Sequence, residues 1–129
     1  GAESIGLNIQ LPKEQRANKY VGRGIAFHYF FSRKVMLSAA AQAYVFFPGG
    51  FGTLDEMTEL VTLIQTKKME VIPIILVGKK FWTPFLKWVH EDMAKNERIS
   101  LEDEKIYQLV DTPEEAFKII KNSKERTIF

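Results

Sequence analysis

The chain has 129 residues, of which 46% are hydrophobic and none is cysteine. This length and content suit one domain with a hydrophobic core, and they exclude disulfides and thiolate metal sites. The formal net charge of +2 is too small to indicate nucleic-acid binding. The longest apolar run, Val71 to Val77, is far shorter than the about 20 residues of a membrane span, and no signal peptide is visible. We therefore expect a cytoplasmic protein without nucleic-acid or membrane partners.

The first part of the chain predicts a strand, a long loop and a second strand. Ser4 to Ile9 alternates apolar with small or polar residues, as strands do. Leu11 to Gly24 is polar and contains a proline and several basic residues, namely Lys13, Arg16, Lys19 and Arg23. Loops of this length inside a compact domain are usually functional or mobile. Ile25 to Phe31 is strongly aromatic, which favours a strand.

A helix is expected over Arg33 to Ala41, with Ser32 as its N-cap. Arg33 and Lys34 would then lie in the first turn, where a cation meets the positive end of the helix dipole at a cost of up to ~1 kcal/mol. A local rule broken in this way points to a site that holds an anion. From this argument alone, two solvated surface charges explain the pair equally well.

A glycine-rich segment, Pro48 to Glu56, lies between an apolar run and a helical pattern. The run Tyr44 to Phe47 is typical of a parallel strand buried on both faces. The helix that follows has an apolar side, made by Leu54, Met57, Leu60, Val61 and Ile64. A strand, a glycine turn and a helix start aim backbone N–H groups and the helix dipole into one space, which suits a phosphate.

Two common phosphate loops do not fit this segment. The P-loop requires a lysine where Thr53 stands, and the dinucleotide motif requires a third glycine where Asp55 stands. Both of these loops are therefore excluded for this segment.

The rest of the chain continues the alternation of strands and helices. We expect strands over Glu70 to Val77, with Pro73 near its start, and over Ile106 to Val110. Thr83 and Pro84 should open one helix, with Trp82, Phe85, Leu86, Val89 and Met93 in the core. Thr112 to Glu115 should open the last helix as a capping box, with Ala116, Phe117, Ile119 and Ile120 turned inward. This order predicts an α/β fold with a mostly parallel sheet flanked by helices, in one domain over 1–129.

Candidate site residues follow from this topology. In parallel sheets ligands bind beyond the carboxyl ends of the strands, which should place Arg33 and Glu56 on the same rim. Glu56 also has a structural interpretation, because Thr53 to Glu56 matches a capping box. Glu59, one helical turn after Glu56, either contributes to the same site or is a solvated surface residue. His28 and His90 lack the spacing of a metal site or a triad, so we interpret them as ordinary surface or core residues.

The segment Pro48 to Glu56 meets every fixed position of the motif P-G-G-x-G-T-x-x-E, and the chain resembles the LOG family, phosphoribohydrolases long mislabelled as lysine decarboxylases. The resemblance is strongest over Tyr29–Lys34 and Phe47–Gln65. It implies a Rossmann-like fold with Arg33 and Glu56 as catalytic residues, because the family's essential Arg and Glu stand at the same interval. It further implies no cofactor, no metal, and a substrate and phosphate site at Gly49, Gly50, Gly52, Thr53, Lys34 and Glu59.

The resemblance also implies a reaction. Water would cleave the N-glycosidic bond of a nucleoside 5′-monophosphate, giving free base and ribose 5-phosphate. Glu56 would stabilise the oxocarbenium-like state and activate water, and Arg33 would orient substrate and Glu56. The alternative is a nucleotide-binding regulatory module that does no chemistry. Cytokinin-type N6-modified adenine and plain adenine both remain open as the base. A lysine decarboxylase would need a pyridoxal phosphate site, of which the sequence has no sign.

Two further expectations concern assembly and completeness. The helix from Arg33 and the helix from Thr53 carry more apolar surface than one sheet face needs, and LOG proteins pair through these helices, so we expect a homodimer. The alternative is that an N-terminal portion of the family domain covers this surface. Family members carry an earlier strand and another glycine-rich loop, which implies that the domain is truncated at its N-terminus.

Overall fold

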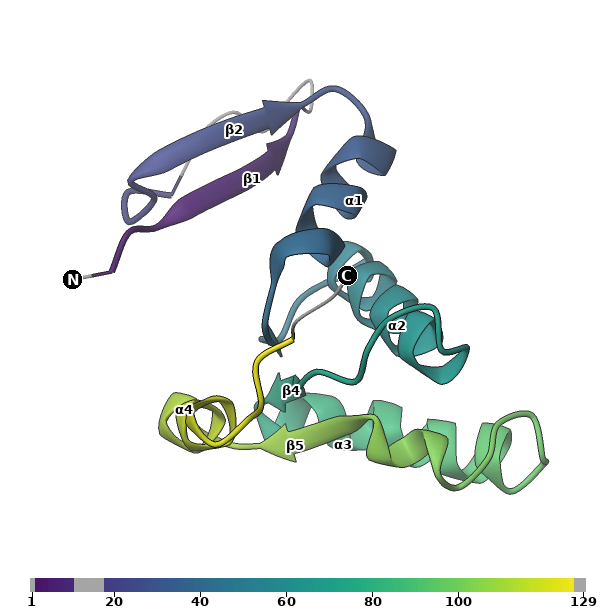
Figure 1. Cartoon of the computed structure of the whole chain (residues 1–129). Coiled ribbons are helices and arrows are strands. Elements are labelled where there is room, and N and C mark those ends of the chain that lie inside the picture. Colours follow the sequence, from purple (N-terminus) through teal and green to yellow (C-terminus); the bar gives the residue numbers. More distant parts are fainter. Residues whose placement is uncertain (1, 11–17, 127–129) are drawn as a thin grey trace. The chain divides into compact units, whose positions relative to one another are not determined.

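The computed structural model describes residues 2–10 and 18–126. The chain divides into two compact units, Gly1–Ala41 and Gln42–Phe129, and each is described by itself. Within the described residues every paired strand is parallel to its neighbour, and helices follow or connect the strands (Figure 1). The predicted Rossmann-like α/β fold with parallel strands is therefore confirmed.

The first unit contains a parallel strand pair and one helix. Strand β1 (Ile5–Ile9) pairs with β2 (Arg23–Phe27) from Ile5↔Arg23 to Ile9↔Phe27. The strand predicted near Ser4 is thus confirmed. The predicted loop over 11–24 is wrong at its end, because Arg23 and Gly24 already belong to β2, and its residues 11–17 lie outside the described part.

The following helix begins earlier than predicted. Helix α1 spans Phe30–Ala40 with Tyr29 as N-cap, so the end of the strand predicted over 25–31 is wrong, as is Ser32 as the cap. Strand β2 stops where its partner stops, because the last ladder bond runs from Gln10 N to Phe27 O at 2.9 Å. An aromatic run has no reason to stay extended once no neighbouring strand pairs with it.

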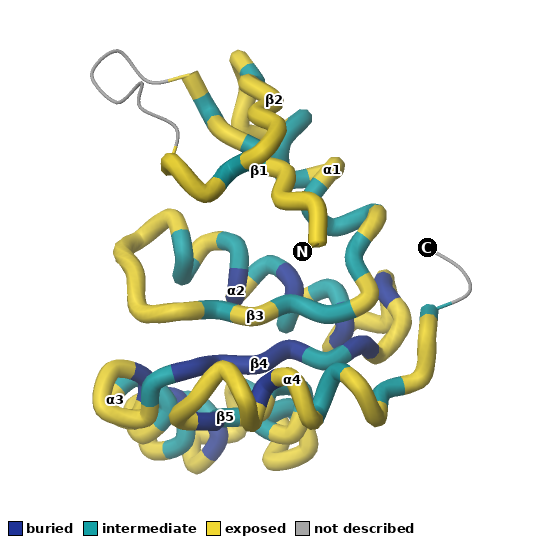
Figure 2. Tube along the Cα trace, turned by 90° about the vertical axis from the view of Figure 1, so that its left-hand side faces the viewer, coloured by how far each residue is buried: buried dark blue, intermediate teal, exposed yellow. Residues whose placement is uncertain are grey.

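The second unit is a three-stranded parallel sheet with helices on both faces. Its strands are β3 (Tyr44–Phe46), β4 (Ile74–Val77) and β5 (Tyr107–Val110), in the order β3-β4-β5. Its α-helices are α2 (Phe51–Gln65), α3 (Lys79–Trp88) and α4 (Pro113–Lys121). Two-sided burial falls on β4, whose four residues are all buried (Figure 2). It was wrongly predicted for β3, which is an outer strand of this sheet with Val45 36% exposed.

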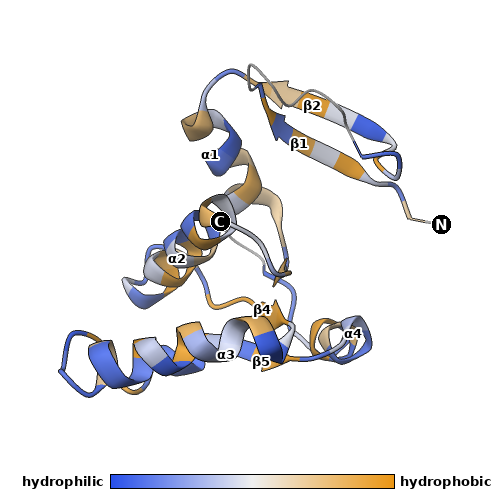
Figure 3. Cartoon of the chain, turned by 180° about the vertical axis from the view of Figure 1, so that it is seen from behind, coloured by the Kyte–Doolittle hydropathy of each residue, from blue (hydrophilic) through white to orange (hydrophobic). Residues whose placement is uncertain are grey.

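Alternate residues of β4 join hydrophobic clusters on opposite faces of the sheet. Ile74 packs with Leu60 and Ile64 of α2, and Leu76 packs with Met57 of α2 and Trp82 of α3. On the opposite face, Ile75 and Val77 pack with Val110 and with Ala116 of α4. The period of two along a strand therefore divides the core between α2 and α3 on one face and α4 on the other. The uninterrupted hydrophobic colour of β4 reflects this burial (Figure 3).

Helix α3 begins at Lys79, not at Pro84 as the sequence predicted, so Thr83 is not its N-cap. Gly78 is the N-cap and has a φ of +104°, a conformation that side chains rarely adopt. The Lys79 N–H donates to Oδ1 of Asp111 at 3.1 Å. This cap comes from the end of β5, so no local pattern could reveal it. Trp82, fully buried, fixes the turn that precedes Pro84.

Other boundaries differ in smaller ways. Strand β4 begins only after Pro73, so Glu70 to Pro73 is not part of it, and α3 continues into a π-helical segment, Val89–Ala94, that was not predicted. The inward face of α3 is confirmed, with Val89 buried and Phe85 and Leu86 packed beside Trp82.

The capping box of α4 is confirmed. The Glu115 N–H donates to Oγ1 of Thr112 at 3.3 Å, and Oε2 of Glu115 accepts from the N–H groups of Thr112 (2.9 Å) and Asp111 (2.8 Å). These backbone donors hold the pKa of the Glu115 carboxyl below its ordinary value. Ala116 is buried as predicted, but Phe117 is 64% exposed, so its predicted inward position is wrong.

This hydrogen bonding predicts a specific acid sensitivity. Because the pKa of Glu115 is lowered in the folded state, its stabilising effect is present above the unfolded pKa and is lost as pH falls through the folded pKa. Glu115→Gln keeps an oxygen that accepts the same N–H groups but cannot titrate. We expect urea unfolding between pH 6 and pH 2 to show a smaller loss of stability in Glu115→Gln than in the unchanged protein.

Glu114→Gln is the matched control. Glu114 accepts no hydrogen bond from the described residues, so its variant should keep the full pH dependence. Equal pH dependence in the Glu115 variant and the unchanged protein would show that the capping box adds nothing to acid sensitivity.

Candidate functional site

The glycine-rich segment connects β3 to α2, and the predicted order of strand, loop and helix is confirmed. Strand β3 ends at Phe46 and α2 begins at Phe51 with Gly50 as N-cap. Gly52 and Thr53 are therefore the second and third helical residues. The N–H groups of Thr53 and Leu54 both donate to the carbonyl of Gly50, at 3.1 and 3.2 Å.

Because α2 begins at Phe51, the predicted role of Glu56 in a capping box is wrong. A capping box would need Thr53 at the N-cap, but that position belongs to Gly50, and no side chain caps it. Glu56 is the sixth residue of α2 and is half-buried, as is Glu59 one turn further. The two carboxylates share one side of the helix at a spacing of three residues. The capping box that would have explained a glutamate at this position is therefore absent.

Gly49 is required by packing inside the loop. A Cβ at Gly49 would lie 2.9 Å from Cβ of Thr53 and closer still to its hydroxyl oxygen. No side chain fits between them, since atoms that are not bonded to each other do not approach so closely. The Thr53 side chain therefore closes against the Cα of Gly49 and holds the loop against the first turn of α2.

Gly50 and Gly52 are glycines for a different reason. A Cβ built on either residue meets no atom within 4 Å, and neither residue has a positive φ. Glycine in the first turn of a helix weakens it by up to about 1 kcal/mol relative to alanine. Nothing in the described residues offsets this cost at Gly52. Glycine at these two positions instead leaves the backbone accessible from outside.

The N-terminus of α2 also retains its hydrogen-bond donors. Within residues 2–10 and 18–126, no acceptor receives the N–H groups of Gly50, Phe51 or Gly52. The first turn of α2 has no acidic residue. At the other helix starts on this edge, a carboxylate of the chain itself accepts a backbone N–H group. Asp111 does so for α3 and Glu115 for α4. Donors, dipole and bare glycines at α2 form an arrangement that can accept a phosphate-sized anion.

A cluster near Glu56 was not predicted from the sequence. Burial raises the pKa of the Tyr44 phenol, the charge of Arg126 opposes this rise, and the charge of Glu56 adds to it. Arg126 is held by Gln42, whose amide oxygen accepts the Arg126 N–H at 2.6 Å and whose amide nitrogen donates to the Arg126 carbonyl at 3.2 Å. No sequence pattern signals a contact between residues so far apart.

Arg33 and Lys34 lie in the first unit, in α1. They are its fourth and fifth residues, so the predicted position in the first turn is wrong, and with it the argument from an unfavourable dipole. The Arg33 guanidinium lies over the ring of Phe30, with Cζ 5.6 Å from the ring centroid. Since Arg33 and Glu56 belong to different units, their meeting at one ligand stays a prediction.

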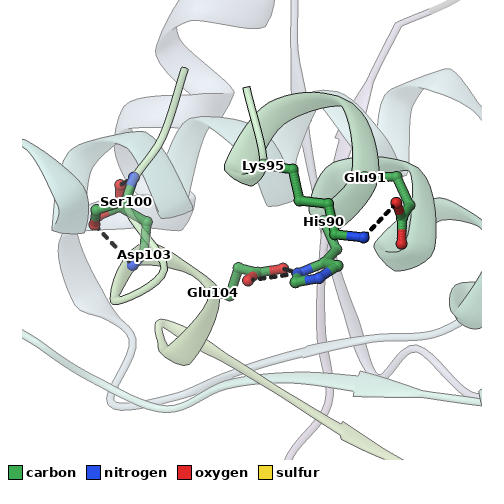
Figure 4. A network of polar contacts seen from close by, with 6 residues as sticks. All are labelled: His90, Glu91, Lys95, Ser100, Asp103 and Glu104. Carbon is green, nitrogen blue, oxygen red and sulfur yellow. Dashed lines mark hydrogen bonds and ion pairs between the residues drawn. The ribbon is translucent and has the colours of Figure 1, made fainter. Parts of the chain in front are cut away.

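Among the described residues, histidine and acidic side chains form a pair but no metal-binding cluster. Nδ1 of His90 lies 3.1 Å from both carboxylate oxygens of Glu104, so this histidine is paired, not isolated (Figure 4). Burial, with a contribution from the charge of Glu104, raises the pKa of Tyr107 to about 12. In the part of the chain that the structure describes, no group of three or more His, Asp or Glu side chains could hold a metal ion. No described helix is long and apolar enough to cross a membrane.

Two comparisons with known proteins bear on this site. Residues 1–120 match the family described as "Possible lysine decarboxylase". The chain is also 35% identical over 71 residues to the cytokinin riboside 5′-monophosphate phosphoribohydrolase LOG of Oryza sativa subsp. japonica. That match covers 55% of this chain and 28% of the rice protein, so the chain spans less than a third of the relative's length. The family match extends through both units and includes the whole segment from Pro48 to Glu56, and the chain therefore belongs to the LOG family.

Proposed function

We propose that the protein hydrolyses the N-glycosidic bond of a nucleoside 5′-monophosphate, giving free base and ribose 5-phosphate. The observation that carries the proposal is the start of α2, where bare glycines and N–H donors without acceptors in the described residues lie one turn before Glu56. Membership of the LOG family supports it. So does the name of the rice relative, which is a phosphoribohydrolase of a riboside 5′-monophosphate.

In this proposal the 5′-phosphate binds the N–H groups of Gly50, Phe51 and Gly52, with the Thr53 hydroxyl as a further donor and Gly49 shaping the loop. One helical turn of about 5.4 Å separates Gly52 from Glu56. A phosphate at the start of α2 therefore lets the sugar lie along the first turn, towards the Glu56 carboxylate. Glu59 lies on the same side of α2 and contacts the substrate further along the helix.

The chemical step breaks the bond between the anomeric carbon and the base nitrogen. The bonding electrons leave with the base, and the sugar becomes oxocarbenium-like, which a nearby carboxylate stabilises. Glu56 then takes a proton from water as the water oxygen bonds to the anomeric carbon, and this proton is passed on to the departing base. By the family resemblance, Arg33 orients Glu56 and the substrate, and Lys34 assists in binding.

A regulatory module that binds nucleotide without chemistry is the competing function. The loop at α2 fits a regulatory module equally well, because it would bind the phosphate of the nucleotide and would not act on the N-glycosidic bond. Release of ribose 5-phosphate from AMP or from a cytokinin riboside 5′-monophosphate separates the two. Binding without release would favour the regulatory module.

The first test of the proposal concerns Glu56 and Arg33. Glu56→Gln and Arg33→Ala should each lower kcat/KM for AMP by roughly 10²-fold or more, as for a lost acid–base or orienting group. Glu56→Gln keeps the size of the side chain and one of its oxygens, so the variant should remain folded and should unfold cooperatively in urea.

Glu70→Gln serves as the control for Glu56→Gln, since Glu70 is an exposed acidic residue between α2 and β4. Its activity should equal that of the unchanged protein. Full activity in Glu56→Gln would leave the carboxylate without a chemical role and would contradict the mechanism.

The second test separates the two kinds of glycine. Gly52→Ala should stabilise the fold by about 0.5–1 kcal/mol, because alanine suits the first helical turn and meets no atom. The same substitution should weaken the binding of AMP, because its methyl group occupies the open space above the backbone. Gly49→Ala should instead destabilise the fold by about 1–3 kcal/mol, through overpacking against Thr53.

Urea unfolding and AMP titration of both variants provide the two readouts. If the Gly52→Ala protein is more stable and binds AMP with unchanged affinity, the phosphate does not bind at the start of α2.

The third test concerns the predicted homodimer. Met57, Leu60 and Ile64 of α2 are buried in the second unit and leave no free stripe there. Helix α1 has no buried residue, and its Phe31 and Met36 are 78% and 51% exposed. We propose that this apolar surface pairs two copies. Light scattering should give a dimer at micromolar concentration and a monomer for Met36→Glu, and a monomeric unchanged protein would contradict the proposal.

A further inference from the structure

Phe51 is the most exposed large hydrophobic residue in the described part of the chain, with 91% of its surface accessible. Single exposed apolar residues are ordinary on protein surfaces. The position of this one is not ordinary, because it is the first residue of α2 and stands between Gly50 and Gly52. Its exposure therefore falls within the candidate site and not on an unrelated face.

The ring of Phe51 is the only side chain on this stretch of backbone. Its two neighbours are the bare glycines whose surroundings are open, and its own N–H is one of the donors without an acceptor in the described residues. Side chains in a helix tilt towards its N-terminus. At the first helical position this tilt is directed towards the helix start, the end at which the N–H groups of Gly50, Phe51 and Gly52 lie.

Within residues 2–10 and 18–126, no other aromatic ring stacks on Phe51. The ring contacts recorded in the described residues involve Tyr44, Phe46, Phe81, Trp82, Phe85 and Trp88, and none involves Phe51. The same holds for Phe47, which lies on the other side of the loop and is 53% exposed. An anion bound at the start of α2 thus lies beside an uncovered aromatic surface.

We propose that Phe51 determines substrate class by packing its ring against the base of the bound nucleoside 5′-monophosphate. This inference rests on the proposed function. Inorganic phosphate or ribose 5-phosphate would satisfy the N–H groups but leave the ring in water, whereas a flat base covers it. Since every base has a π-face, such stacking tolerates different bases. Phe51 therefore separates nucleotides from sugar phosphates but does not select one base from another.

The test compares the binding of AMP and of ribose 5-phosphate by calorimetry, which requires no turnover if the ligand is bound to the Glu56→Gln protein. Phe51→Ala should weaken AMP binding by roughly 5- to 100-fold, the range of one base–aromatic stack. Its affinity for ribose 5-phosphate should stay within about twofold, as no base is present to lose. Phe51→Tyr keeps the ring and should restore AMP affinity.

Phe117→Ala is the matched control, because Phe117 is also an exposed phenylalanine, at the middle of helix α4 in the same unit. It should change neither affinity. Unchanged AMP binding in Phe51→Ala would overturn the inference. So would an equal loss for AMP and ribose 5-phosphate, which would mean that the substitution disturbs the loop itself.

Binding and turnover measurements test the role of Phe51 and the proposed function separately. If AMP binds and Phe51→Ala behaves like the unchanged protein, the role of Phe51 falls and the phosphate site stands. If the unchanged protein binds neither ligand, the phosphate site falls and the role of Phe51 falls with it. If binding follows the expected pattern and no ribose 5-phosphate is released from AMP, the role of Phe51 stands and the hydrolase function falls.

Discussion

Parallel pairing of β3, β4 and β5 is the constraint on which the second unit depends. Three parallel strands must all end at one edge, and each is followed there by a helix start. Helix starts carry N–H groups without partners and the positive end of a dipole, so this edge gathers unsatisfied donors. The buried strand β4 makes the arrangement stable, because its alternate residues are shared between helices on opposite faces.

The chain satisfies these helix starts unequally. It provides Asp111 for α3 and the Thr112–Glu115 pair for α4, so both have carboxylates close to their first turns. At α2 it provides glycines instead, and only Gly49 is explained by packing. Carboxylates of the chain accept N–H groups at the starts of α3 and α4, but no side chain of the described residues does so at α2. The start of α2 is therefore suited to an external anion. This contrast is physical support for the proposed site that does not depend on the family resemblance.

Much of the fold could be predicted because its signals are local. The capping box at Thr112 needs only four neighbouring residues, and the segment Pro48 to Glu56 carries its own order of strand, loop and helix. The predicted boundaries of helices and strands were wrong where residues far away in the sequence determine them. Asp111 caps α3 from another strand, so Pro84 appeared to start a helix that begins at Lys79. The end of β1 determines the end of β2, which the aromatic run up to Phe31 could not reveal. The residues of the glycine motif were predictable, whereas Tyr44 and Arg126 became visible only through tertiary contacts.

The amide pair between Gln42 and the backbone of Arg126 has a consequence for how the second unit is assembled. It joins residues 84 positions apart, and β5 likewise reaches its neighbour β4 across the whole of α3. Closing such long loops costs entropy before any contact repays it, so structures rich in them fold slowly. During synthesis the N-terminal part of a chain emerges first. The surroundings of Tyr44 are therefore completed only when the segment around Arg126 has been synthesised, and a nascent chain holds the glycine loop before it holds the cluster beside Glu56.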